Sequence, residues 1–170
     1  TRASVEKYAK EIVESNCDFG GEQSNALRML VDHIDNLFYD DRGKEWIVSK
    51  ALKKGIGVHH GSVPKYIQQE IISLFNQGDL KVLICTTTIT EGVNTSAKNM
   101  LVLSGKKGRK SLKKFDAQNI AGRAGRFMYH YQGRVFILEK AFADCMNEEG
   151  EFLRHKFFDK EADKSDVDIV

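Results

Sequence analysis

Three short apolar segments constrain the fold of this chain more than any other feature. They are LKVLICT (80–86), NMLVLS (99–104) and RVFILE (134–139). Nearly continuous apolar runs of this length are typical of strands that are buried on both faces of a sheet. The stretches between them are long enough for helical crossovers, and strands that alternate with helices form parallel sheets. We therefore predict an α/β domain whose mostly parallel sheet is flanked by helices.

Helical spacing of apolar residues accounts for much of the remaining chain. It predicts helices over 2–16, 22–39, 44–54 and 65–77. The period changes at IGVHH (56–60), a short and β-favouring segment that predicts a further strand. Gly55 suits the end of one helix, and Pro64 suits the first turn of the next. A last helix is possible within 141–160, followed by a tail or linker at 163–170. By length the chain corresponds to one domain, which we place at 1–162.

The start of the chain is unusual for this architecture. The first predicted element is a helix, whereas in a parallel α/β domain a helix normally follows a strand. We therefore expect that a strand precedes residue 1 in a longer protein.

The composition excludes several classes of protein. There is no apolar run that could span a membrane and no signal peptide at the start, so we expect an intracellular protein, cytoplasmic or nuclear. Three scattered cysteines indicate neither a disulfide framework nor a zinc site. The net charge is only +2, but six basic residues and no acid occur from Lys106 to Lys114. That basic segment could meet phosphate or simply face solvent.

No independent catalytic or metal-binding motif is present. The segment SGKKGRKS (104–111) fails the phosphate-loop pattern because Lys110 does not follow a glycine. Neither a nucleophile elbow nor His-Glu-x-x-His occurs, so no metal site is expected. His59 and His60 are adjacent on a predicted strand and point to opposite faces. A packed or hydrogen-bonded role is therefore favoured over joint metal binding.

The segment DAQNIAGRAGR (116–126) carries two Gly-Arg pairs in a helix-capable stretch. Each helical glycine costs roughly 1 kcal/mol relative to alanine, so either something approaches this backbone closely or the helix ends here. On a helix, Arg123 and Arg126 would share a face and could bind one polyanion, although a solvated helix face is the alternative. We expect this segment to join the other polar loops at the carboxyl ends of the strands, where open parallel sheets bind ligands.

The order of these segments resembles the second RecA-like domain of superfamily 2 helicases, closest to the Ski-like DExH branch. LICTTTITEGVNTSAKN (83–99) looks like motif V, NIAGRAGR (119–126) like motif VI and GIGVHHGS (55–62) like motif IVa. The opening Thr-Arg resembles the residues that follow the motif IV strand. The resemblance covers residues 1–4 and most of 55–139, with a helical insertion at about 17–54. It implies a RecA-like three-layer fold.

The resemblance also implies roles for individual residues. Arg123 and Arg126 would reach ATP on a partner domain, with Arg126 as the finger on the γ-phosphate. The residues near the nucleotide and the cleft would be Gly92, Asn94 and Asn119. The contacts to the nucleic-acid backbone would come from Thr1, Arg2, Gly61, Thr86 and Thr87. Asn119 stands where the family usually has Gln, and Glu91 argues against the DEAD-box subgroup, in which many members carry Arg there.

The implied function is that of the C-terminal motor domain of an ATP-dependent helicase or translocase on single-stranded RNA or DNA. The phosphate loop, the catalytic base and the Mg²⁺ ligands would belong to an N-terminal RecA-like domain of the same chain. We therefore expect this fragment to be inactive alone, with no bound cofactor of its own. Two alternatives remain: a non-catalytic RecA-like module that binds nucleic acid or protein, and a motor domain of a DNA restriction or defence complex.

Overall fold

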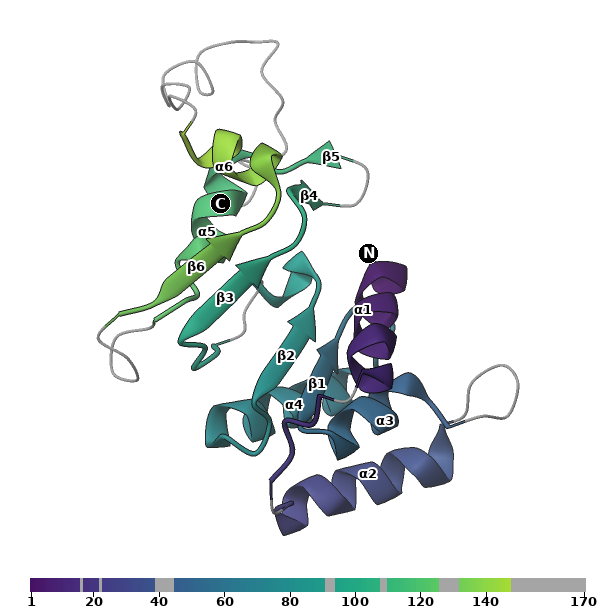
Figure 1. Ribbon diagram of the computed structural model, residues 1–170. Helices are drawn as coiled ribbons and strands as arrows, with labels where there is room; N and C mark the ends of the chain where they lie inside the picture. The colour runs from purple at the N-terminus through teal and green to yellow at the C-terminus, as the bar shows by residue number, and fades with distance from the viewer. Residues whose placement is uncertain are drawn as a thin grey trace, which may run out of the picture.

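The computed structural model describes residues 1–15, 17–21, 23–38, 45–90, 94–107, 110–125 and 132–147. Helices and strands alternate along most of this part of the chain, as Figure 1 shows. The helices are α1 (Arg2–Glu14), α2 (Asn25–Leu37), α3 (Ile47–Lys53), α4 (Lys65–Gln77), α5 (Lys114–Ala121) and α6 (Lys140–Asn147), with a 3₁₀ turn η1 (Thr87–Thr90). The strands are β1 (Ile56–His59), β2 (Val82–Cys85), β3 (Asn99–Val102), β4 (Lys106–Lys107), β5 (Lys110–Ser111) and β6 (Arg134–Ile137).

The four main strands form two parallel pairs. β1 pairs with β2, with His59 opposite Cys85, and β3 pairs with β6, with Val102 opposite Ile137. Among the described residues, the two pairs are not hydrogen-bonded to each other. The α/β fold and its parallel strands are thus confirmed, with the sheet divided between β2 and β3.

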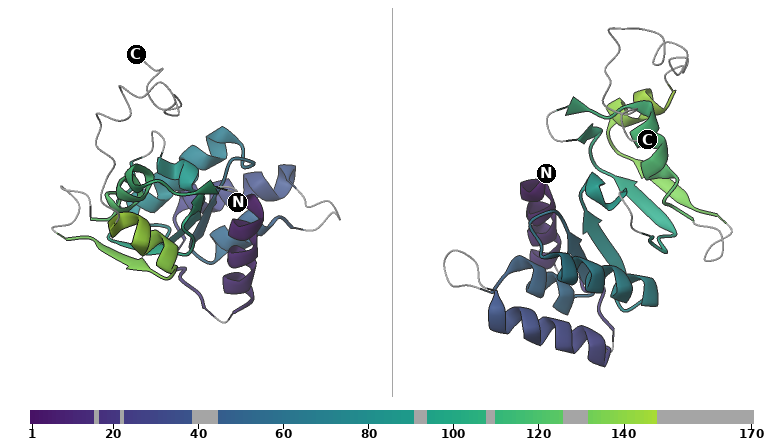
Figure 2. Two further views of the ribbon diagram at one scale, coloured as in Figure 1. Left: turned by 90° about the horizontal axis from the view of Figure 1, so that it is seen from above. Right: turned by 180° about the vertical axis from the view of Figure 1, so that it is seen from behind.

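A large core covers the first pair of strands on both faces. α1 packs along β1 and β2 in front in Figure 1, α3 packs against β1, and α4 covers β1 on the face that the view from behind in Figure 2 shows. β1 is buried along its whole length. At Gly57 an added Cβ would lie 2.8 Å from Ile71 of α4 and 2.9 Å from Leu83 of β2. The missing side chain at Gly57 is therefore what allows α4 to pack this closely on the strand.

A smaller core supports the second pair of strands. It consists of five buried residues from β3, α5, α6 and the segment that joins β5 to α5: Val102, Leu112, Ala117, Phe142 and Cys145. The side chains of Leu101 and Phe136, which lie opposite each other in the pair, are 56% and 50% exposed. The second pair is thus covered on one face only within the described residues.

The predicted elements were mostly correct, with three differences. α4 begins directly after Pro64 and ends at Gln77, as predicted, and its C-cap Gly78 has φ 87°. α2 starts later than predicted, because Ser24 caps it by accepting a hydrogen bond from the amide of Leu27. The antiparallel β4–β5 hairpin was not predicted, and α5 ends before the two arginines. Of the last predicted helix only α6 lies in the described part, and the predicted tail at 163–170 lies outside it.

No helix in the described ranges is both long and apolar enough to cross a membrane.

Candidate nucleotide and nucleic-acid site

The parallel pairing of β1 with β2 brings three predicted nucleic-acid contacts together. Gly61 follows the end of β1, and Thr86 and Thr87 follow the end of β2. The amide of Thr86 donates a hydrogen bond of 3.1 Å to the carbonyl of His59, which joins the two strand ends. An added Cβ at the exposed Gly61 would meet nothing within 4 Å. The turn at Gly61 therefore leaves space for a ligand backbone to approach.

The other two predicted contacts lie at the start of α1. Thr1 caps this helix through its Oγ1, which accepts from the amide of Ser4 at 3.3 Å. Arg2 donates from Nε to Oε1 of Glu6 at 2.8 Å, and that oxygen lies 3.3 Å from Nε2 of His60. The first turn of α1 contains no acidic residue, so the positive end of its helix dipole is uncompensated there. The start of α1 thus joins the carboxyl ends of β1 and β2. We call Thr1, Arg2, Gly61, Thr86 and Thr87 the carboxyl-edge group.

Both histidines at the end of β1 are buried, at 4% and 0% exposure, which confirms the predicted packed role. Desolvation is the largest effect on each ring and lowers the pKa of His59 and of His60. Nearby Glu6 raises the pKa of His60, but desolvation, which is the largest effect, and the charge of Arg2 lower it, and the net shift is downward. Both rings are therefore neutral at pH 7.

The two Gly-Arg pairs do not lie on one helix. α5 ends at Ala121, Gly122 is its C-cap, and the amide of Arg123 donates to the carbonyl of Ile120 at 3.1 Å in a tight turn. Of the possibilities that the sequence left open, the helix ends here, so Arg123 does not lie on a helix face. A helix cannot continue because Gly125 adopts φ 66°, a left-handed conformation that disfavours side chains. Arg126 lies outside the described residues.

Gly125 meets the chain that leads into β6. Its amide donates to the carbonyl of Ala97 at 2.8 Å. A Cβ at Gly125 would overlap the backbone of Gly133 and would lie 2.8 Å from the carbonyl carbon of Gln132. The glycine is thus required by a backbone crossing inside this chain. We call residues 122–125 the Gly-Arg turn.

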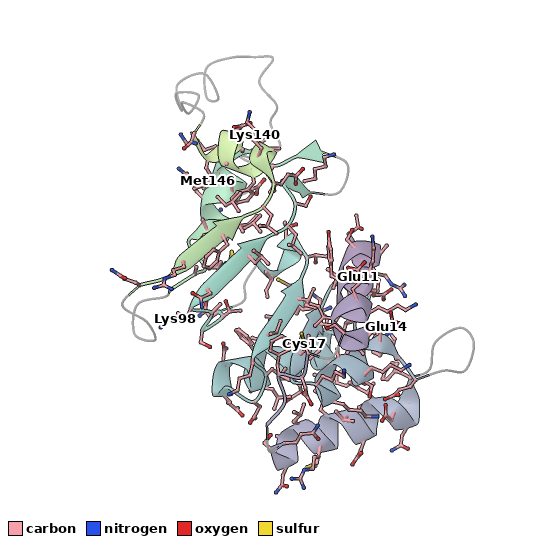
Figure 3. All side chains as sticks on the ribbon, in the orientation of Figure 1. Glu11, Glu14, Cys17, Lys98, Lys140 and Met146 are labelled. Carbon is pink, nitrogen blue, oxygen red and sulfur yellow. The ribbon has the colours of Figure 1, made fainter. Side chains whose placement is uncertain are left out.

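The Gly-Arg turn lies at the amino ends of β3 and β6. Ala97 precedes β3 by two residues and Gly133 directly precedes β6. Figure 3 labels Lys98 at this amino end of β3. The expectation that this segment joins the loops at the carboxyl ends of the strands is therefore wrong. The half-buried Arg123 and the carboxyl-edge group lie at opposite ends of the sheet.

One segment links the two ends. Residues 86–90 leave the carboxyl end of β2 and contact α5 through η1, and residues 94–97 lead into the amino end of β3. Asn76 of α4 fixes the far part of this segment, because its side chain donates to the carbonyl of Asn94 at 2.9 Å and accepts from the amide of Ser96 at 2.8 Å. Asn119 is exposed on α5, and Gly92 lies outside the described residues.

Three residues that fix the backbone or the side chains around these loops were not predicted from the sequence. They are Glu6, which binds Arg2, Asn76, which binds Asn94 and Ser96, and the buried Gln68, which binds the carbonyls of His60 and Val63. Arg2 and Glu6 have the spacing of a helical ion pair, which was a readable signal. Asn76 and Gln68 act on backbone groups of distant or irregular segments, and no periodic pattern marks such contacts.

Comparison with known proteins agrees with this geometry. Residues 28–128 match the family described as the helicase conserved C-terminal domain. The chain is 45% identical over 105 residues to Anti-bacteriophage protein B of Escherichia coli, covering 62% of this chain and 14% of that protein. It is 30% identical to Antiviral helicase SKI2 of Saccharomyces cerevisiae and 26% identical to human Exosome RNA helicase MTR4, each over 81% of this chain. The chain spans only 11% and 14% of those two relatives. The chain has a RecA-like fold, and its relatives include helicases of the Ski-like branch of superfamily 2. Because the family match covers more than half of the chain, the chain belongs to the helicase conserved C-terminal domain family.

Proposed function

We propose that this chain is the C-terminal motor domain of an ATP-dependent helicase or translocase. The observation that carries the proposal is the Gly-Arg turn. Two features fix its shape: the hydrogen bond from Gly125 to Ala97 and the crossing at Gly133. An arginine in a rigid turn is pre-organised, because less side-chain and backbone freedom is lost when it binds an anion.

The nucleotide of this motor would be ATP with Mg²⁺, held mainly by an N-terminal RecA-like domain of the same protein. Arg123 and Arg126 would reach its phosphates across the cleft, with Arg126 on the γ-phosphate, where an arginine stabilises the charge of the transition state. Gly92, Asn94 and Asn119 would line the same cleft. The chain contains no phosphate loop of its own, so the 170 residues alone would not hydrolyse ATP.

The carboxyl-edge group would bind the backbone of single-stranded RNA or DNA. Its members offer two threonine hydroxyls after the end of β2, an uncrowded glycine turn after β1 and the start of α1, whose first turn has no acidic residue. Such donors suit phosphate contacts that do not depend on base identity. Because the Gly-Arg turn and the carboxyl-edge group are separate, one domain could contact the nucleotide through the first and the nucleic acid through the second at the same time. We further propose that the protein acts inside the cell.

The test is the single-strand-stimulated ATPase of the full-length protein. Arg126→Ala should lower kcat by roughly 10³–10⁵-fold, the range known for arginine fingers, and Arg123→Ala should also lower it. Arg28→Ala is the matched control, because Arg28 lies exposed on α2, away from both groups, and should leave kcat unchanged. Near-normal turnover by Arg126→Ala would refute the finger assignment. Strong turnover by the isolated chain would refute the need for a partner domain.

A second candidate is a motor domain in a DNA defence complex. The name of the Escherichia coli relative, Anti-bacteriophage protein B, favours it. Stimulation of the ATPase by DNA but not by RNA would support this candidate. A third reading, a non-catalytic binding module, predicts nucleic-acid binding with no ATP turnover in the full-length protein.

We also propose that the domain extends over 1–162, with an inserted helical region at about 17–54, and that a strand before residue 1 completes the sheet. The facing edges of β2 and β3 carry no ladder hydrogen bonds within the described residues, and α1 begins at the carboxyl ends of the strands, where a preceding parallel strand would end. In the full-length protein, the edge amides of both strands should then exchange hydrogen slowly. Fast exchange on both edges would contradict the added strand.

A further inference from the structure

His60 is buried between two parts of the carboxyl-edge group. Its Nδ1 accepts a hydrogen bond of 3.2 Å from the amide of Ser62, in the turn that contains Gly61. An atom that accepts from an N–H carries no proton, so in the neutral ring the hydrogen is on Nε2. That Nε2 is fully buried and lies 3.3 Å from Oε1 of Glu6, a close contact without good hydrogen-bond alignment.

Glu6 continues this contact to the start of α1. The same Oε1 accepts from Nε of Arg2 at 2.8 Å. A chain of contacts therefore runs from the amide of Ser62 through the ring of His60 and the carboxylate of Glu6 to Arg2. It joins two segments that are more than fifty residues apart in the sequence.

The turn is also held from its other side. The carbonyl of His60 accepts from the amide of Val63 at 3.0 Å and from Nε2 of Gln68 at 3.1 Å. Gln68, which is 6% exposed, also donates to the carbonyl of Val63 at 2.5 Å. With α4 fixing one side of the turn, the ring of His60 determines where the turn stands relative to α1.

We infer that His60 is a positioning residue for nucleic-acid binding, which holds the Gly61 turn and the Thr1–Arg2 end of α1 in one geometry. This inference rests on the proposed function. His60 does not touch the strand itself. It acts only in its neutral form with the hydrogen on Nε2, because a proton on Nδ1 would face the N–H of Ser62 and remove that bond.

The surroundings of the ring keep it neutral. The charged and titratable groups around it are Glu6, Arg2 and the ring of His59. Desolvation, the largest effect, lowers the pKa of His60 below the ordinary value of 6.5. The contacts that join the Gly61 turn to α1 through His60 are therefore intact at pH 7. They are lost as the pH falls through the lowered pKa of His60, which lies below 6.5, and the ring takes up its second proton.

The test uses four variants of the full-length protein and measures the dissociation constant for a single-stranded oligonucleotide and the kcat of the stimulated ATPase. His60→Phe keeps the packing but removes both contacts, and should weaken binding about 10-fold, as expected for one or two lost hydrogen bonds. The kcat at saturating oligonucleotide should change less than about 2-fold, because the contacts of the His60 ring involve Ser62 and Glu6 and none of the residues proposed for the nucleotide. Glu6→Gln should weaken binding in the same direction.

Two variants separate positioning from a structural role. In His60→Asn the side-chain oxygen can accept from the amide of Ser62, so binding should largely recover and should lose its dependence on pH below 6.5. His59→Phe is the matched control, because His59 is also buried, at 4% exposure, and its Nδ1 has no hydrogen-bond partner among the described residues. It should leave the dissociation constant unchanged. Unchanged binding by His60→Phe, or an equal loss in His59→Phe, would overturn the inference.

The failure of the proposed function gives a different result. If single strands neither bind the wild-type protein nor stimulate its ATPase, the proposed function is wrong. The ring geometry can be read separately from the ¹⁵N shifts of labelled histidine, which distinguish an unprotonated Nδ1 from an unprotonated Nε2. A hydrogen on Nδ1 at pH 7 would overturn the positioning role whatever the binding result.

Discussion

The Gly-Arg turn allows a sharp prediction, because its two glycines differ in backbone conformation and in the space around the missing side chain. Gly125 has φ 66°, and a Cβ there would overlap the backbone of Gly133. Gly122 has φ −66° and ψ −4°, and its Cβ would lie 3.2 Å from the carbonyl oxygen of Gln118. Replacing each by alanine adds the same methyl group to two different backbones.

The magnitude for Gly125→Ala has two parts. Placing alanine in the left-handed region costs about 1–2 kcal/mol. Overpacking against backbone, which no rotamer change can relieve, adds about 1–3 kcal/mol. The free energy of unfolding should therefore fall by about 2–5 kcal/mol, a large part of the 5–15 kcal/mol that is usual for a domain. Gly122→Ala should stay within about 1 kcal/mol of the wild type, because alanine favours the end of a helix and the contact is only tight.

The assay is urea unfolding followed by circular dichroism. With a slope of about 1–3 kcal/mol per molar urea, the Gly125→Ala midpoint should fall by about 0.7 M or more, and the Gly122→Ala midpoint should hardly move. In the full-length protein, Gly125→Ala should also lower the ATPase kcat, since it displaces Arg123. Equal midpoints for the two variants would refute the argument that the crossing at Gly133 dictates the second glycine.

Two further predictions concern the large core. Ile67→Ala should destabilise the protein by about 2–5 kcal/mol, because Ile67 is completely buried. Met29→Ala should change stability by less than about 0.5 kcal/mol, because the side chain of Met29 is 73% exposed. Thermal unfolding of both variants measures the difference. The free energy of unfolding should also decrease as the pH is lowered below 6.5. His59 and His60 have lowered pKa values in the folded state, so the unfolded chain takes up protons at a higher pH than the folded chain. The slope should reach up to about 1.4 kcal/mol per pH unit for each histidine, and should be smaller in His60→Asn. A pH-independent stability between 6.5 and the folded pKa values would contradict the burial of both rings as neutral groups.

Local signals in the sequence predicted much of the fold. The helix at 65–77 was placed correctly because Pro64 and Gly78 mark its two ends. The three apolar runs contain β2, β3 and β6. The expectation that these strands are buried on both faces was wrong for β3 and β6, because Leu101 and Phe136 are 56% and 50% exposed among the described residues. The β4–β5 hairpin was missed because two-residue strands of lysine and serine have no periodicity and no apolar face.

The parts that could not be predicted depend on contacts between distant residues. The end of α5 follows from Gly125 and Gly133, which meet only because the chain crosses itself at the start of β6. The contact between Glu6 and His60 likewise arises only when α1 packs beside β1. Resemblance to a family indicated which residues to examine. It did not indicate that the Gly-Arg turn lies at the amino ends of β3 and β6, whereas the carboxyl-edge group lies at the carboxyl ends of β1 and β2.

The division of the apolar interior has a consequence for how the domain opens. The large core joins α1, α2, α3, α4 and β1, whereas the second contains only five buried residues around β3, α5 and α6. Free energies of subglobal opening follow buried apolar contacts, so amides of the second unit should reach exchange-competent states at lower cost than those of the first. Arg123 belongs to this less stable unit, while the carboxyl-edge group is built on the more stable one. A ligand that bridges Arg123 to a partner domain would therefore stabilise the weaker half of the domain most, and its binding would be seen as slowed hydrogen exchange in α5 and α6.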